Sequence, residues 1–137
     1  MRIYFDTSAL AKRYVMESGT EKVNNLFIKA DQVVVSVITF PELISALSRN
    51  TKEKKISRAQ YAERKAEAVR DFKDMGICDL TPNVIGSTLR FIEEFSLRTL
   101  DAIHLACAHE TRTELFVTSD KKQSKTAQLL HMKELLI

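Results

Sequence analysis

The chain has 137 residues, a length that suits one compact domain with a sizeable buried core. Hydrophobic residues make up 45% of it and charged residues 28%, which excludes a disordered chain. The formal net charge of +3 permits a nucleic-acid partner without requiring one.

Short β-rich runs alternate along the chain with longer segments of helical periodicity. The predicted strands cover residues 3–5, 33–35, 77–80, 115–117 and 135–137. The predicted helices cover residues 9–16, a segment around 23–30, and residues 39–48, 57–75, 82–95, 99–110 and 121–131. Because such alternation implies right-handed crossovers, it predicts an α/β fold of three layers (α/β/α) around a central parallel sheet of four to five short strands. We expect residues 1–137 to form this single domain.

The long helix predicted over residues 57–75 carries one narrow apolar stripe, formed by Ala62, Ala66, Val69 and Phe72. We expect Phe72 to pack in the core. The alanines could also pack there, or they could receive a second helix from a partner, because small side chains allow helices to approach closely.

Four acidic residues stand where a strand-like run gives way to a helix, or in the first turn of a helix. They are Asp6, Glu42, Asp101 and Asp120. In a parallel sheet the strand ends that lead into helices open on one edge, so these acids can converge on one pocket. Carboxylates a few ångströms apart repel one another by several kcal/mol at an effective dielectric of about 20, so the pocket calls for a divalent cation. Oxygen ligands favour Mg²⁺ or Mn²⁺ over zinc.

Each acid also has a purely structural interpretation. Asp6 and Asp120 can cap the helices that follow them. Glu42 fits a capping box with Thr39, and Asp101 lies two residues after a threonine that could cap its helix, where the helix dipole favours negative charge. Serine or threonine could have served at these openings, so the repeated use of acids favours a shared site.

Four segments of the chain resemble, in order and spacing, the signature regions of PIN-domain ribonucleases. They are Asp6-Thr7-Ser8-Ala9-Leu10, Pro41-Glu42-Leu43, Leu100-Asp101-Ala102-Ile103-His104-Leu105-Ala106 and Val117-Thr118-Ser119-Asp120. The similarity runs from Ile3 to about Leu130 and is strongest to VapC-type toxins of type II toxin–antitoxin systems.

This resemblance implies an Mg²⁺- or Mn²⁺-dependent ribonuclease, expected to be an endonuclease that hydrolyses RNA phosphodiester bonds. It also implies a cognate antitoxin as partner and a homodimer. By match to the motifs, the four acids take the metal-ligand and catalytic roles. Thr7, Ser8 and Ser119 occupy the supporting polar positions beside them.

Basic residues close to the acids in sequence are the expected RNA contacts. They are Lys12, Arg13, Arg98, Lys121 and Lys122. A further basic run over residues 49–58 is either a solvated helix connection or a second contact. His104 lies one turn after Asp101, so it could reach the pocket rim or pack in the core.

Two other function classes remain open from the residues. One is a catalytically idle PIN-like module that binds RNA or protein, which the loss of an acid would have marked; none is lost. The other is an acidic-pocket phosphotransfer domain, which is disfavoured because Ser8 stands where a second aspartate would be expected.

The remaining features bear on the cellular environment. Cys78 and Cys107 are isolated in the sequence, with no Cys/His cluster, so neither a zinc site nor a disulfide framework is indicated. The N-terminus runs straight into a strand, and no apolar run approaches the length of a membrane span. We therefore expect a cytoplasmic protein with no membrane partner.

Overall fold

Five short parallel strands form one sheet in the order β3-β2-β1-β4-β5. The computed structural model describes residues 1–137, and its strands are β1 (Arg2–Phe5), β2 (Gln32–Ser36), β3 (Gly76–Cys78), β4 (Leu115–Thr118) and β5 (Glu134–Leu136). Chain order reverses beside β1, because β2 pairs with it on one side and β4 on the other. Ligands of open parallel sheets bind at such a reversal, outside the carboxyl ends of the strands.

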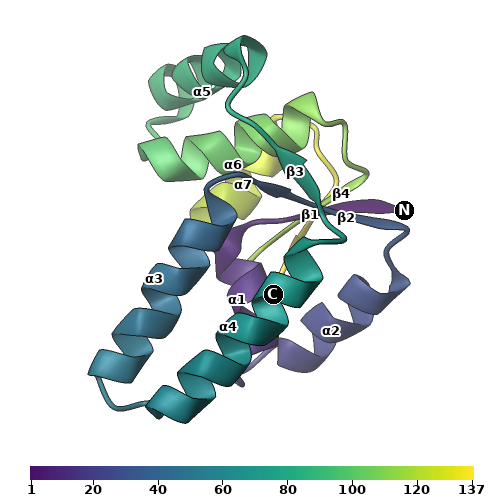
Figure 1. The fold of residues 1–137 in the computed structure, drawn as a ribbon. Helices are drawn as coiled ribbons and strands as arrows, with labels where there is room; N and C mark the ends of the chain where they lie inside the picture. Colours follow the sequence, from purple (N-terminus) through teal and green to yellow (C-terminus); the bar gives the residue numbers. More distant parts are fainter.

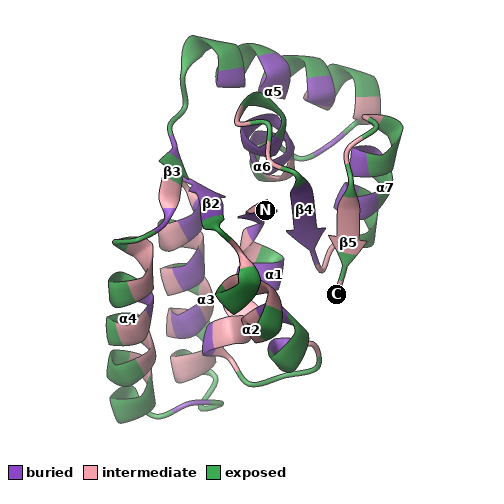
Figure 2. Ribbon diagram, turned by 90° about the vertical axis from the view of Figure 1, so that its right-hand side faces the viewer, coloured by how far each residue is buried: buried purple, intermediate pink, exposed green.

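Seven helices cover the sheet on both faces (Figure 1), and this confirms the predicted three-layer α/β/α fold. They are α1 (Thr7–Tyr14), α2 (Thr20–Lys29), α3 (Thr39–Lys52), α4 (Arg58–Phe72), α5 (Pro82–Phe95), α6 (Thr99–Glu110) and α7 (Lys121–Leu129). The first four lie on one face, and α5, α6 and α7 lie on the other (Figure 2). None of the seven combines the length and hydrophobicity that crossing a membrane requires.

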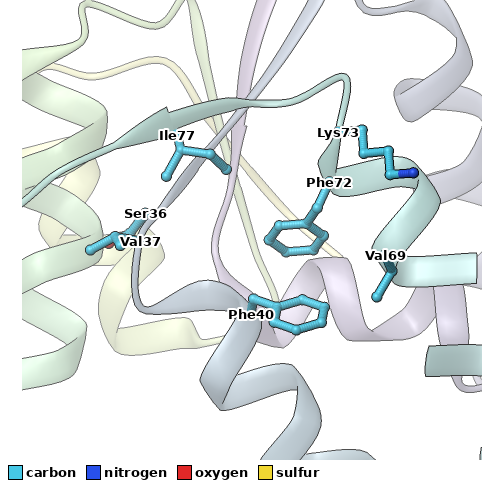
Figure 3. Close-up of a pocket in the computed structure, with 7 residues that line it drawn as sticks. All are labelled: Ser36, Val37, Phe40, Val69, Phe72, Lys73 and Ile77. Carbon is cyan, nitrogen blue, oxygen red and sulfur yellow. The ribbon is translucent and has the colours of Figure 1, made fainter. Parts of the chain in front are cut away.

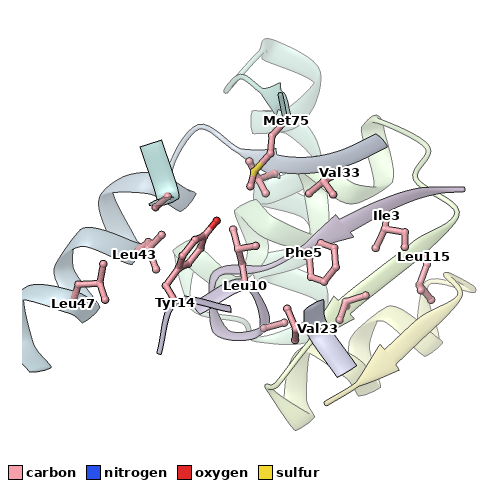
Figure 4. Close-up of a cluster of buried hydrophobic side chains, with 14 of the residues drawn as sticks. Ile3, Phe5, Leu10, Tyr14, Val23, Val33, Leu43, Leu47, Met75 and Leu115 are labelled. Atoms are coloured by element: carbon pink, nitrogen blue, oxygen red, sulfur yellow. The ribbon is translucent and has the colours of Figure 1, made fainter. Parts of the chain in front are cut away.

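Each face of the sheet has its own buried hydrophobic cluster. Side chains alternate along a strand, so Ile3 and Phe5 of β1 join the cluster under α1–α4, whereas Tyr4 joins the cluster under α5–α7. Figure 4 shows the first cluster, where Leu10 of α1 lies between Phe5 of β1 and the ring of Tyr14, and Leu43 of α3 lies on the other side of that ring. The sheet is therefore buried on both faces and only its edges and strand ends are open to ligands.

Helix α4 buries a different face from the one that its apolar stripe predicted. Phe72 packs against the core as expected, but Ala62, Ala66 and Val69 are exposed, and the fully buried residue of the helix is Ala68. Of the two interpretations of the alanines, the structure excludes core packing.

An apolar pocket of about 380 Å³ lies beside this exposed face of α4, where β2 and β3 end (Figure 3). The rings of Phe40 and Phe72 form its floor and meet edge to face, with centroids 5.0 Å apart. Val37, Val69 and Ile77 line it and are each about 40% exposed. The pocket lacks acidic residues, so it is chemically distinct from the site of the four acids.

Candidate active site

The carboxylate of Asp6 follows β1 at the sheet's reversal point and is almost wholly buried, with 1% of the residue exposed. Its Oδ1 accepts hydrogen bonds from Ser8 Oγ (2.7 Å) and from the backbone N–H of Ala9 (3.0 Å), which caps α1 as one interpretation predicted. Its Oδ2 accepts from Thr118 Oγ1 (2.6 Å) and Gln123 Nε2 (2.9 Å). Burial raises the pKa of this carboxyl, although the hydrogen bonds act in the opposite direction. Four donors thus fix its orientation.

Asp101 lies in the first turn of α6, and Gln123 links it to Asp6. Its Oδ1 accepts from Gln123 Nε2 at 3.3 Å, and its Oδ2 accepts from Arg98 Nε at 3.2 Å. A single amide nitrogen therefore donates to two carboxylates that stand 95 positions apart in the sequence. Gln123 is 3% exposed, and its Oε1 is buried without a hydrogen-bond partner.

Glu42 does not cap α3, so the alternative of a capping box with Thr39 is wrong. The helix has no side-chain cap, and the hydroxyl of Thr39 is buried without a partner. The Oε1 of Glu42 instead accepts a hydrogen bond from Thr7 Oγ1 (2.7 Å) and lies 2.6 Å from His104 Nε2. Burial alone would raise the pKa of the Glu42 carboxyl, but the hydrogen bond and charge of His104, with the bond from Thr7, lower it overall.

His104 connects the acidic edge to the core, so both interpretations of this residue hold. It is 2% exposed, and its Nδ1 lies 2.8 Å from the hydroxyl of Tyr4, which is buried in β1. Its Nε2 meets Glu42 and lies 3.2 Å from Thr7 Oγ1. Because both ring nitrogens have partners, the imidazole is locked and orients the Glu42 carboxylate.

Asp120 serves as the N-cap of α7. Its Oδ1 accepts from the backbone N–H groups of Lys122 (2.8 Å) and Gln123 (3.0 Å), whereas its Oδ2 forms no hydrogen bond. The N–H of Asp120 donates to Thr118 Oγ1 (3.0 Å), the same hydroxyl that donates to Asp6. Asp120 therefore joins the network through a relay and keeps one oxygen free for a ligand.

Two of the three predicted supporting hydroxyls donate to the acids, whereas the hydroxyl of Ser119 donates to the backbone carbonyl of Ser8 (3.3 Å). Thr7 donates to Glu42 and Ser8 donates to Asp6. Ser8 Oγ also accepts from the backbone N–H of Ser119 (2.9 Å), which ties the start of α1 to the end of β4. These contacts hold the two loops at the sheet's reversal point together.

A pocket of about 520 Å³ opens beside this network. Glu42 and Asp101 line it from α3 and α6, and Arg49 and Arg98 line the same pocket. Arg49 is the member of the basic run 49–58 that lines this pocket. A pocket with two carboxylates and two arginines can bind a cation and a phosphate group side by side.

The oxygen atoms at this site are of the kind that binds a hard divalent cation. No three acidic, histidine or cysteine side chains already surround a common point closely enough to hold a metal ion. Yet Asp6 and Asp101 both bind one positively polarised N–H₂ group, and the unpaired Oε1 of Gln123 is a further buried oxygen. Carboxylate and amide oxygens are the ligands that Mg²⁺ and Mn²⁺ prefer. The assignment of all four acids as ligands stays a prediction.

Two of the five predicted RNA contacts are engaged inside the protein. Arg13 donates to Asp71 of α4 (2.8 Å) and to Asn24 of α2 (2.9 Å). Lys12 donates to the carbonyl of Ser18 (2.9 Å), in the loop between α1 and α2. Both side chains thus tie α1 to neighbouring segments, and their contact with RNA stays a prediction.

The other three predicted contacts flank the acids. The side chain of Arg98 is 83% exposed and lines the acidic pocket. Lys121 is exposed at the start of α7, and the Nζ of Lys122 donates to the carbonyl of Ser96 (2.9 Å). Arg98 and Lys121 are therefore the cations with the freest access to a strand at this edge.

Sequence reasoning missed Gln123 entirely, together with the hydroxyl of Thr118. A signal for Gln123 exists: it lies one turn before Ala127, which is fully buried, so it occupies a core-facing position of α7. A polar residue on a buried helix face needs a polar partner, and the acids are the nearest candidates.

The chain is similar to known proteins over most of its length. Residues 3–129 match the family model of the PIN domain. The chain is similar to ribonuclease VapC47 of Mycobacterium tuberculosis, with 32% identity over 126 residues, covering 88% of this chain and 85% of that protein. It is 28% identical over 110 residues to ribonuclease VapC45 of the same species, covering 77% of this chain and 74% of that protein.

Solved structures share the three-layer fold. The crystal structure of Mycobacterium tuberculosis VapC20, a sarcin-ricin loop cleaving toxin, superposes with a TM-score of 0.70 at 15% identity, over 90% of this chain and 94% of that one. A toxin–antitoxin complex from Klebsiella pneumoniae gives a TM-score of 0.67 at 20% identity, over 88% of each chain. At these identities the likeness concerns the fold alone.

Proposed function

The chain belongs to the PIN domain family, and on that basis we propose that it is a divalent-metal-dependent endoribonuclease, the toxin of a toxin–antitoxin pair. The observation that carries the proposal is the convergence of Asp6, Glu42 and Asp101, from three different elements, at the carboxyl edge of the sheet. The 32% identity to a relative named as a ribonuclease supports RNA as the substrate.

We assign the metal-ligand roles to Asp6, Glu42, Asp101 and Asp120, with Mg²⁺ or Mn²⁺ as the ion. When bound, the metal supplies a nucleophilic water at neutral pH and offsets the negative charge that grows on the phosphoryl and leaving oxygens. The protein's own contribution is orientation. Neighbouring hydrogen-bond donors hold each carboxylate that faces the site, in the way that metal ligands are typically oriented by hydrogen-bond partners.

The basic side chains around the acidic pocket bind the RNA. Arg49 and Arg98 line the same pocket as Glu42 and Asp101, so a phosphate that their guanidinium groups bind would lie near the carboxylates. Lys121 extends the positive charge along the start of α7. Contacts of this kind position a strand without reading its sequence.

The decisive test is cleavage of labelled RNA by the purified protein. EDTA should abolish cleavage, and Mg²⁺ or Mn²⁺ should restore it. Asp101→Asn should be inactive, whereas Glu93→Gln, which neutralises an exposed acid on α5, should cleave at the wild-type rate. Undiminished cleavage in EDTA would refute the metal requirement. Intact RNA under every metal condition would favour an idle binding module instead.

We further propose that the protein works in the cytoplasm as a homodimer under the control of a cognate antitoxin. The similarity to a solved toxin–antitoxin complex supports an antitoxin. Two buried free thiols fit a reducing compartment. A small reading frame beside the gene should encode a protein that co-purifies with this chain and relieves its toxicity on co-expression. Light scattering on the isolated chain should give twice its 15.6 kDa mass.

A further inference from the structure

We propose that Gln123 is a positioning residue of the metal site, which bridges Asp6 and Asp101 through its amide N–H₂ when no metal is bound and turns its amide oxygen toward them when metal binds. This inference rests on the proposed function, since it assumes that the two carboxylates take up a divalent cation.

The bridge matches the chemistry of a primary amide. The Nε2 of Gln123 carries two hydrogens and lies 2.9 Å from Asp6 Oδ2 and 3.3 Å from Asp101 Oδ1. Two carboxylates that converge in a buried site repel each other, and a shared positively polarised donor weakens that repulsion. Gln123 therefore offsets part of the repulsion between the two carboxylates and holds them in a fixed relative position.

The other end of the same amide has no partner. Gln123 Oε1 is buried and accepts no hydrogen bond, in a residue that is only 3% exposed. Buried polar atoms without partners are rare in native structures and call for an explanation, such as a ligand that the atom awaits. A half-turn of the amide group exchanges nitrogen and oxygen. The reversed amide would be repelled by two free carboxylates, but a cation between them would attract it.

The backbone of Gln123 is already fixed for this exchange. It lies in the first turn of α7, and its N–H is bonded to the Oδ1 of Asp120 at 3.0 Å. The proposed exchange is a rotation of the amide group at the end of the side chain and involves no change in the backbone. A merely structural role for Gln123 would predict equal stabilisation of the metal-free and metal-bound protein, and this difference makes the inference testable.

The experiment measures Mn²⁺ affinity by calorimetry and melting temperature in EDTA and in Mn²⁺, without RNA. Gln123→Leu keeps the volume but removes both ends of the amide, and we expect Mn²⁺ binding to weaken by about 10- to 100-fold, the range seen when a partner of a metal ligand is lost. Gln128→Leu is the matched control, because Gln128 lies on the same helix and its amide binds Glu134 away from the acids. It should bind Mn²⁺ with wild-type affinity.

A second variant, Gln123→Glu, should respond more strongly to Mn²⁺ than the wild type. Gln123→Glu places a third carboxylate at the bridge, so its melting temperature should fall in EDTA, and Mn²⁺ should raise it by more than it raises that of the wild type. Unchanged Mn²⁺ affinity in Gln123→Leu, or a Gln123→Glu protein that Mn²⁺ stabilises no more than the wild type, would overturn the role of Gln123 alone. A wild-type protein that binds no Mn²⁺ would overturn the proposed function and this inference together.

Discussion

Replacement of Asp6 by asparagine should abolish cleavage while leaving the protein about as stable as the wild type, or more stable. The change keeps the shape of the side chain and removes its charge. In the wild type this carboxylate is 1% exposed, and burial disfavours its charged form strongly enough to raise its pKa despite four hydrogen bonds. Asp6→Asn removes that penalty.

The hydrogen bonds around Asp6 can adapt to an amide. Asparagine keeps one acceptor oxygen and turns the other into an N–H₂ group, which needs acceptors. The hydroxyl of Thr118 can rotate to accept, and the unpaired Oε1 of Gln123 can turn to do the same. We therefore expect the free energy of unfolding of Asp6→Asn to lie within about 1 kcal/mol of the wild-type value or above it.

Asp6→Ala should behave differently, and it provides the contrast. It removes the cap of α1, worth about 1 kcal/mol, and leaves buried donors unpaired, at about 1–3 kcal/mol. A loss of about 2–4 kcal/mol lowers the melting temperature by about 6–12 °C at roughly 3 °C per kcal/mol for a chain of this size.

Two measurements on the same preparations distinguish a metal ligand from a helix cap at Asp6. They are the melting temperature in EDTA at pH 7 and the rate of cleavage of labelled RNA in Mn²⁺. Loss of a direct metal ligand should lower the cleavage rate by at least about 100-fold in both variants. Wild-type cleavage by a folded Asp6→Asn protein would reduce Asp6 to a helix cap. Equal destabilisation by Asn and Ala would refute the argument from buried charge.

Three further outcomes follow from the structure. Arg13→Ala should lower stability by about 2 kcal/mol, because it breaks a largely buried ion pair with Asp71, but the folded variant should bind RNA as the wild type does; weaker binding would return Arg13 to the RNA surface. In the Asp101→Asn variant, which should not cleave RNA, Lys121→Ala should reduce the slope of log affinity for RNA against log salt concentration by about 0.7. An unchanged slope would exclude a phosphate contact. Burial raises the pKa of the Cys78 thiol to about 12, so native protein should react with a thiol reagent at pH 8 far more slowly than denatured protein, and equal rates would contradict its burial.

The sequence alone was sufficient to predict the order and type of the helices and strands, because these depend on local or periodic signals, and the same signals made the four acids candidates. Helix α5 begins at Pro82 as predicted, since proline suits the first turn and the hydroxyl of Thr81 accepts from the N–H of Val84 (3.2 Å). Asp6 and Asp101 stand next to recognisable helix starts, and parallel topology brings such starts to one edge of a sheet.

Only the tertiary structure decided which face of α4 is buried. Its apolar stripe predicted one face, but the helix turns Asp71 inward instead, because Arg13 and the hydroxyl of Tyr14 both donate to that carboxylate at 2.8 Å. A charged residue can face inward when a partner on another helix neutralises its charge. The sequence pattern of α4 alone carries no information about such a partner.

The same reason explains why the sequence did not reveal the roles of Gln123 and His104. Gln123 and His104 each lie on a helix among buried residues, and their own neighbours in sequence indicate nothing more than a polar residue in a core position. Their partners, Asp6 and Glu42, are 117 and 62 positions away. The sequence by itself predicted the four acids as candidates, whereas their orientation depends on contacts that exist only once the sheet and its two helical layers have assembled.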